Sequence, residues 1–300
     1  MGWIRILLIL GPMLVGFAVA FMVISGTRSA RLSGRRSPLT QGLLRPAGHT
    51  LRNQFDDAFS DVMGLVILVL FLPALAGAMY GGVYLVPGRP FSWVTAAVYL
   101  AFAVVAIAFA TYRMKKLHGK AMSLRMGWDA EVATGQELDQ LMRRGAVVFH
   151  DFPAGEFNID HVMICSAGIY AVETKSRMKP ERGNKDGGKV TYDGKALLFP
   201  DWTDTQIVEQ ARRQAKWLAS ELSKAVGEPL QVVPVVALPG WYVNVTGRSD
   251  VRVLNPKNFH FLLENRAASL PPVLVDRIAY QVEQRCRDVS PAYSPKNKSS

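Results

Sequence analysis

The sequence predicts an α/β domain, in which a mixed β-sheet is flanked by helices, preceded by three transmembrane α-helices. Two observations lead to this fold class. Three long apolar stretches occupy most of the first 112 residues, whereas amphipathic and short β-branched segments alternate after about residue 120. In addition, 49% of the 300 residues are hydrophobic, which is too high for an ordinary soluble protein in which 20% are charged.

The three apolar stretches predict the membrane-spanning helices. Residues 3–25 are apolar apart from Arg5, and about 20 apolar residues suffice to cross the hydrocarbon core. A cleavable signal peptide is the alternative for this segment, since Ala18-Val19-Ala20 resembles a cleavage site, but the apolar run continues beyond it. Residues 62–86 and 91–112 carry no charge, and the short turn between them predicts a helical hairpin.

Basic residues around these stretches predict the orientation, because Lys and Arg are retained on the cytoplasmic side. They gather in the loop at 27–61 and directly after the third stretch. The predicted topology places the N-terminus outside and the C-terminal domain in the cytoplasm, at a bacterial inner (plasma) membrane. Spans two and three contain no ionisable residue, which argues against a transporter and favours an anchor. The net charge of +11 is thus first a topology signal and only then an attraction for phosphate.

The chain after the anchor predicts alternating strands and helices. Charged residues interleaved with apolar ones at helical spacing indicate helices, and short β-branched runs between Gly- or Pro-containing turns indicate strands. We expect helices at 128–144, 205–226 and 272–287, and strands at 146–149, 159–165, 169–175, 190–192, 196–199, 230–238 and 251–254. The predicted units are a first helix (1–26), a basic cytoplasmic loop (27–61), a helical hairpin (62–112), an α/β domain (120–270), and a C-terminal helix with a disordered tail (271–300).

Two carboxylates and a lysine are predicted to meet in one hairpin. Strand alternation places Glu173 and Lys175 on the same face, and the turn at 166–168 folds Asp160 towards Glu173. Carboxylates hold Mg²⁺, which activates water and neutralises phosphate charge. A nearby lysine can hold or deprotonate the attacking water, or stabilise the pentacovalent oxygens. The grouping therefore suits metal-assisted phosphodiester hydrolysis. A solvated strand face with a Glu/Lys pair is the alternative for an isolated Glu-x-Lys.

Three segments carry a family resemblance, namely GWDAE (127–131), NIDHVMICSAGIYAVETKS (158–176) and EQARRQAKWLASEL (209–222). In this order, over about residues 125–265, they resemble the nuclease-related domain (NERD) family of the PD-(D/E)xK nuclease superfamily. The resemblance implies a restriction-endonuclease-like mixed sheet and a Mg²⁺ cofactor, with Mn²⁺ as an alternative. It implies that Asp160 and Glu173 are metal ligands and that Lys175 is the catalytic lysine.

Two further residues are assigned by the resemblance alone. Glu131 matches a family glutamate that would be another metal ligand, although Ala130 stands where the family usually has Gly. Gln210 matches a glutamine that would orient phosphate or metal-bound water, although the family's preceding Asn-Pro is replaced by Gln206-Ile207. The alternative for Gln210 is a polar residue on an exposed helix face.

The segment after Lys175 is rich in Lys and Arg. Arg177 and Lys179, nearest to the predicted site, are candidates for contacts with a phosphate backbone, and Tyr192, Phe199 and Trp202 are candidates for base stacking. A solvated, flexible hairpin is the alternative. We expect His150 and His161 to be structural, and Cys165 and Cys286 to be reduced and buried.

The sequence therefore predicts a membrane-anchored, Mg²⁺-dependent nuclease that acts on DNA or RNA. One alternative is a module of the same fold that binds nucleic acid or a protein without cleaving. Another is a scaffold whose membrane helices assemble with a larger complex, such as a DNA-transfer apparatus.

Overall fold

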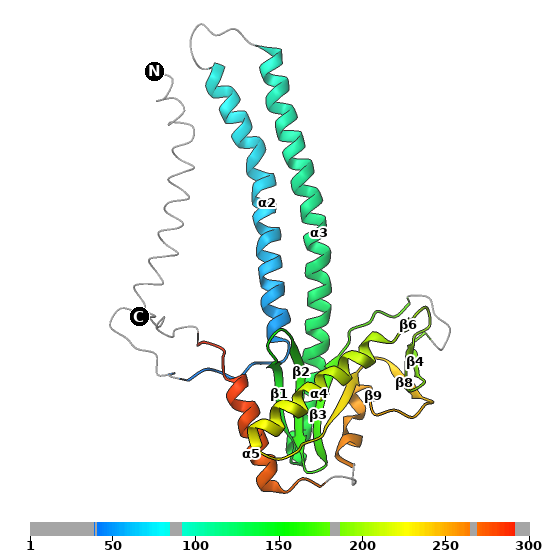
Figure 1. The fold of residues 1–300 in the computed structure, drawn as a ribbon. Helices are drawn as coiled ribbons and strands as arrows, with labels where there is room; N and C mark the ends of the chain where they lie inside the picture. The colour runs from blue at the N-terminus through cyan, green and yellow to red at the C-terminus, as the bar shows by residue number, and fades with distance from the viewer. Residues whose placement is uncertain (1–38, 40, 85–91, 181–186, 265–268, 292–300) are drawn as a thin grey trace. The chain divides into compact units, whose positions relative to one another are not determined.

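The chain divides into two units in the computed structural model, which describes residues 39, 41–84, 92–180, 187–264 and 269–291 (Figure 1). One unit contains Phe55–Met122, and the other combines Gln41–Gln54 with Ser123–Pro291. The first predicted membrane span, at 3–25, lies outside the described residues, as do the predicted turn at 87–90 and most of the predicted disordered tail.

Two helices in the described part of the chain are long and apolar enough to cross a membrane, by length and composition. They are α2 (His49–Tyr84) and α3 (Trp93–Gln140). Helix α2 begins within the segment that we predicted to be a loop, at 27–61. Helix α3 does not end with the third apolar stretch but runs on into the helix predicted at 128–144, because strong helix formers and no proline connect the two.

The main sheet has five strands in the order β1-β2-β3-β7-β9. They are β1 (Val147–Pro153), β2 (Asn158–Cys165), β3 (Gly168–Thr174), β7 (Val232–Ala237) and β9 (Arg252–Leu254). The first three pair in antiparallel fashion, and the last two join in parallel. The predicted mixed α/β architecture is confirmed.

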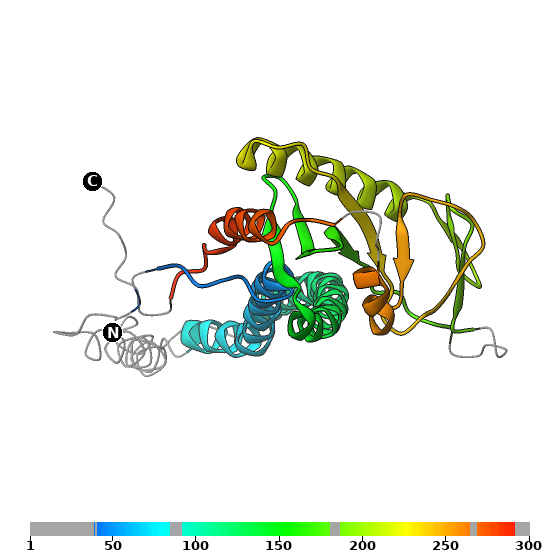
Figure 2. The ribbon, with the colours of Figure 1, turned by 90° about the horizontal axis from the view of Figure 1, so that it is seen from below.

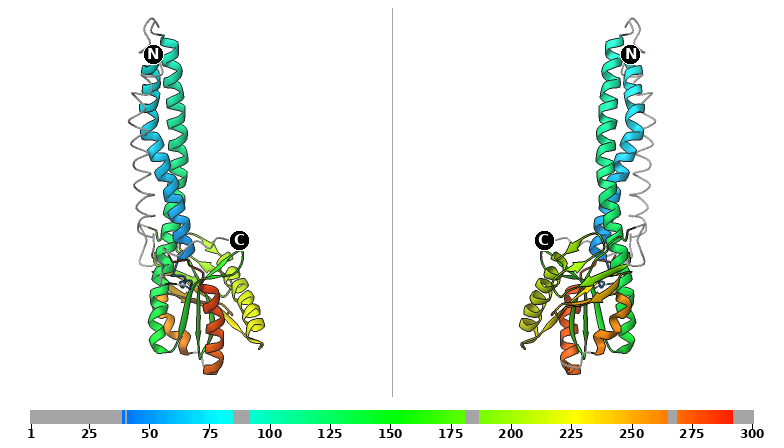
Figure 3. Two further views of the ribbon diagram at one scale, coloured as in Figure 1. Left: turned by 90° about the vertical axis from the view of Figure 1, so that its left-hand side faces the viewer. Right: turned by 90° about the vertical axis from the view of Figure 1, so that its right-hand side faces the viewer.

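Helices cover both faces of this sheet (Figures 2 and 3). Helices α4 (Gln206–Val226) and α5 (Pro272–Cys286) pack on one face, around Val162, Ile164 and Leu218. The end of α3 and the 3₁₀ helices η1 (Leu141–Arg144) and η2 (Pro256–Glu264) contribute to the core on the other face. Helix α5 therefore belongs to the core of the α/β unit, whereas the sequence placed it in a separate C-terminal segment.

A second sheet has four short strands in the order β6-β5-β4-β8. The predicted hairpin forms between β4 (Lys189–Tyr192) and β5 (Leu197–Leu198), where the Asp193 carboxylate accepts the backbone N–H groups of the turn. We did not predict β6 (Thr203–Asp204) or β8 (Tyr242–Val245), which pair with partners distant in sequence or have only two residues.

Residues 41–54 add a clasp to the α/β unit that the sequence did not indicate. Leu43 forms an antiparallel bridge with Val289, and Arg45 pairs with the buried carboxylate of Asp151 at 2.9 Å. The Thr50 hydroxyl donates to the same carboxylate at 2.8 Å. Asp151 has a φ of +50°, a left-handed conformation that is uncommon outside glycine but that Asp and Asn tolerate.

Candidate active site

The β2–β3 hairpin brings Asp160 and Glu173 together, as the strand pattern predicted. The antiparallel register ends with His161 opposite Val172, and Asp160 and Glu173 are the next residues on the two strands. The Glu173 charge acts on the Asp160 carboxylate. The Asp160 carboxylate also accepts the backbone N–H of Thr174 at 2.7 Å, which fixes its position against β3.

Three side chains hold the buried carboxylate of Glu173. The Lys175 ammonium lies 2.5 Å from Oε1, and the Gln210 amide donates to the same oxygen at 2.8 Å. The Gln214 amide donates to Oε2 at 2.6 Å. Gln210 therefore faces the acidic pair rather than solvent. Both glutamines come from α4 and are four residues apart, a spacing that puts them on one helix face.

Burial and neighbouring charges raise the pKa of Asp160 and of Glu131. Burial raises the pKa of Asp160 well above its ordinary value, and the charges of Glu173 and Glu131 raise it further. Burial also raises the pKa of Glu131 to about 8, with added repulsion from Asp151 and Glu173. Burial lowers the pKa of Lys175, but attraction to Glu173 more than offsets this and leaves it raised. Lys175 is thus a cation at neutral pH.

The chemistry of this donor set fits a hard divalent cation. Asp160 and Glu173 supply carboxylate oxygens whose mutual repulsion a bound cation would relieve, and Mg²⁺ commonly uses one or two carboxylates and retains several waters. Within the described ranges, no three His, Cys, Asp or Glu side chains are grouped to hold one metal ion. Glu131, at the polar end of α3, interacts with the pair through its charge.

The basic segment after Lys175 lies differently from the prediction. Arg177 pairs with Asp204 at 3.1 Å and lies over the Trp202 ring, so its charge is already engaged within the protein. Lys179 is exposed, with its ammonium 5.8 Å from the centroid of Trp241. Other cations of this run, Arg182 and Lys185, fall outside the described residues.

Of the three aromatic residues suggested for base stacking, two are buried, and Trp202 is 39% exposed. Tyr192 is buried and donates its hydroxyl hydrogen bond to Ser249. Phe199 is buried and stacks on Trp202 with centroids 4.2 Å apart. Trp202 has Phe199 on its ring and the Arg177 guanidinium 5.0 Å from its centroid. These rings stabilise the second sheet.

His150 and His161 form a pair away from the acidic cluster. They are opposite each other in the β1–β2 register, and their Nδ1 atoms are 2.9 Å apart. His150 Nε2 lies 3.1 Å from Asp139. Burial lowers the pKa of His161 well below its ordinary value, and the adjacent His150 lowers it further. The geometry gives the pair a structural role between two strands.

Sequence reasoning missed Gln214. It is a buried polar residue in the apolar stripe of α4, between Ala211 and Leu218, and one helical turn after Gln210. A glutamine at that spacing within a buried stripe was a signal that a polar partner lay opposite it, because buried amides need hydrogen-bond partners.

Residues 126–239 match the family model described as the nuclease-related domain, NERD. This range contains Glu131, the β2–β3 hairpin and both glutamines of α4, and the match supports the assignment of this segment to the NERD family. No curated protein and no solved structure matches the chain.

Proposed function

We propose that this protein is a membrane-anchored, metal-dependent nuclease that hydrolyses phosphodiester bonds of DNA or RNA at the cytoplasmic face of the inner membrane. The observation that carries the proposal is the convergence of Asp160, Glu173 and Lys175 within the segment that matches the nuclease-related domain. That match by itself indicates a nuclease-related function. The positions of Asp160, Glu173 and Lys175 suggest which residue would perform each step of the hydrolysis.

Asp160 and Glu173 would hold Mg²⁺ or Mn²⁺, with Glu131 as a further ligand through water. When bound, the ion would lower the pKa of a coordinated water and neutralise charge on the phosphate. Gln210 and Gln214 hold the Glu173 carboxylate in place, so that its position does not depend on the ion.

Lys175 would stabilise charge rather than accept a proton. Its raised pKa keeps the ammonium charged at neutral pH, and a charged ammonium has no lone pair with which to deprotonate water. A cation 2.5 Å from Glu173 is close enough to contact the oxygens of a phosphate that approaches the same carboxylate. Lys175 would therefore favour the transition state, in which negative charge on the phosphoryl oxygens increases.

The test is cleavage by the full chain, purified in detergent free of host nucleases, on single- and double-stranded DNA and RNA with Mg²⁺ or Mn²⁺. We expect Asp160→Asn and Lys175→Ala to lower the cleavage rate by roughly 10²–10³-fold, as loss of a transition-state contact does. Lys257→Ala, on η2, is the matched control and should cleave like the natural chain. Undiminished cleavage by both site variants would overturn the proposed site.

A binding module without cleavage is the second candidate function. It is favoured by the absence of a three-ligand metal group among the residues that the structure describes. In that case the full chain would bind nucleic acid equally with Mg²⁺ or with a chelator, and would leave it intact.

The anchoring part of the proposal draws on the two apolar helices. Large apolar side chains on them are exposed in this chain, among them Leu70 at 68%, Leu100 at 67% and Phe109 at 65%. Lipid would cover such a surface, whereas its exposure to water along two long helices would be energetically unfavourable. The basic residues before α2 and after the apolar part of α3 favour the cytoplasm for both flanks.

Alkaline phosphatase, which is active only outside the cytoplasm, tests this topology. A fusion after Ser300 should be inactive, and a fusion in the 86–90 loop should be active. The reverse pattern would overturn the orientation, and two inactive fusions would overturn the membrane hairpin.

A further inference from the structure

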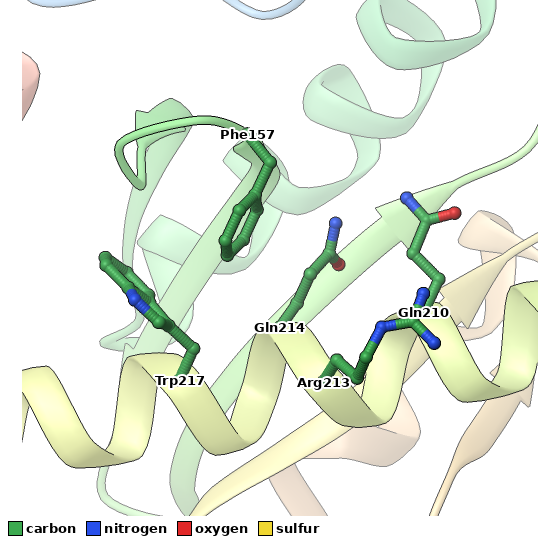
Figure 4. A pocket seen from close by; sticks show the side chains of 5 residues that line it. All are labelled: Phe157, Gln210, Arg213, Gln214 and Trp217. Carbon is green, nitrogen blue, oxygen red and sulfur yellow. The ribbon is translucent and has the colours of Figure 1, made fainter.

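A pocket of about 420 Å³ lies on α4 directly beside the acidic cluster (Figure 4). Its lining comes from Gln210, Arg213, Gln214 and Trp217 of α4 and from Phe157, which precedes β2. Gln210 and Gln214 are four residues apart, as are Arg213 and Trp217, so these two neighbouring rows form one side of the helix. The volume lies within the range of pockets that bind small organic groups.

Two aromatic rings form one side of the pocket. Phe157 and Trp217 meet edge to face, with centroids 5.4 Å apart and an interplanar angle of 73°. Phe157 is 38% exposed, and Trp217 is partly exposed. They present aromatic surface next to the site, and flat aromatic groups such as nucleobases stack on such surfaces.

The other side of the pocket is polar and continuous with the acidic cluster. Figure 4 shows Gln214 between the two aromatic residues and the pair Arg213 and Gln210. The side-chain nitrogens of Gln210 and Gln214 donate hydrogen bonds to Glu173. A ligand in this pocket would therefore be separated from the Glu173 carboxylate only by these two glutamine side chains. The Gln214 Oε1 is buried and has no donor among the described residues, and a buried acceptor of this kind is costly to leave unsatisfied.

Arg213 supplies a cation at the rim of the pocket. It is exposed and forms no ion pair with a carboxylate in the described part of the chain. Its neighbour Arg212 differs, because Glu209 and Asp250 both pair with it. An uncompensated guanidinium beside aromatic surface matches a nucleotide, which combines a flat base with an anionic phosphate.

We propose that this pocket binds an unstacked nucleobase of a single-stranded nucleic acid, next to the phosphodiester bond at the acidic cluster. The base stacks on Phe157 and Trp217, and Arg213 contacts an adjacent phosphate. Bases of an intact duplex are paired and stacked, so they reach such a pocket only at the cost of unstacking. The preferred substrate is therefore a single strand. The role of the pocket in substrate choice rests on the proposed nuclease function, whereas the experiment below measures binding alone.

The experiment measures binding of the full chain in detergent, with EDTA present so that metal-dependent cleavage does not occur. The probes are a fluorescein-labelled single-stranded DNA oligonucleotide and an oligonucleotide of the same length made of abasic sites. We expect Phe157→Leu and Trp217→Leu each to weaken binding of the base-bearing probe by about 5- to 100-fold, the usual effect of losing one stacked base, and to leave the abasic probe unchanged. Phe261→Leu, an exposed ring on η2, is the matched control and should bind both probes like the natural chain.

Equal binding of the base-bearing probe by the natural chain and the exposed Phe157→Leu variant would overturn the proposal, even if Trp217→Leu fails to fold. Equal loss on both probes, or tighter binding of a blunt duplex than of the single strand, would overturn it too. Base-dependent binding without any metal-dependent cleavage would support the pocket while rejecting the nuclease function. Metal-dependent cleavage with base-independent binding would support the nuclease function and overturn the pocket proposal.

Discussion

At the acidic cluster, the pKa values of Asp160 and Glu131 depend on burial and on neighbouring charges. Asp160, Glu173 and Glu131 repel one another, and Lys175 compensates part of that repulsion. Burial, together with repulsion from Asp151 and Glu173, raises the pKa of Glu131 from 4.5 to about 8. The folded protein therefore retains a proton over a pH range in which the unfolded chain has released it.

This difference predicts the direction of a pH effect on stability. Without divalent cations, the contribution of Glu131 to the stability of the natural chain should be lost as the pH rises from about 4.5 to about 8, since this group retains its proton in the folded state in that window. Glu131→Gln has no proton to release, so its free energy of unfolding should fall less between pH 5 and pH 8, by on the order of a few kcal/mol. Thermal unfolding at the two pH values measures this.

The exposed Glu156→Gln variant is the control for the Glu131 measurement and should follow the natural chain. Equal pH slopes for Glu131→Gln and the natural chain would contradict the assigned environment. Addition of Mg²⁺ at pH 8 should stabilise the natural chain more than Glu131→Gln.

Among the elements, the β1–β2 hairpin contains two histidines whose pKa values are lowered, whereas the pKa of Glu131 is raised. His150 and His161 bind each other across the register, and burial lowers the pKa of both, although Asp139 opposes the shift at His150. A folded histidine with a lowered pKa stabilises the protein above the ordinary value of 6.5, and this stability is lost as the pH falls below it.

We therefore expect the hairpin to weaken in acid. The contribution of the pair to stability should be lost as the pH falls from about 6.5, because the unfolded histidines take up protons that the folded pair resists. His161→Leu removes the buried imidazole, so its midpoint of thermal unfolding, relative to that of the natural chain, should be higher at pH 5 than at pH 7. His118→Ala, at an exposed position, should keep the natural slope. An unchanged slope in His161→Leu would show that the pair does not titrate on unfolding.

The α/β unit of the molecule is completed by residues from before the membrane hairpin. Arg45 and Thr50 bind the carboxylate of Asp151, which is 2% exposed, and Asn158 donates to Thr50 at 2.6 Å. A fragment that starts near residue 118 lacks both partners. It leaves a buried carboxylate without its cation, which typically costs about 3–5 kcal/mol.

The clasp predicts that Asp151→Asn changes the unfolding temperature in opposite directions in the full chain and in a fragment without residues 41–54. In the full chain, Asp151→Asn should lower the unfolding temperature, because it removes the ion pair with Arg45. In the fragment 118–291, the same substitution should raise it, because it removes an unpaired buried charge, and Asn tolerates the positive φ of this position. Differential scanning fluorimetry of the four proteins measures both effects. A substitution that lowers the unfolding temperature in both contexts would contradict the role of the clasp.

The sequence by itself determined the features that depend on local pattern. Strand alternation and the turn at 166–168 predicted the Asp160, Glu173 and Lys175 grouping, and apolar run length predicted the two described membrane-length helices. Only the tertiary structure decided what depends on contacts between distant segments. Gln214 on Glu173, Arg45 on Asp151, and the pocket between Phe157 and Trp217 join residues 41 to 106 positions apart. No local periodicity encodes such pairs, because burial and hydrogen bonding select them only once the sheet and α4 have packed.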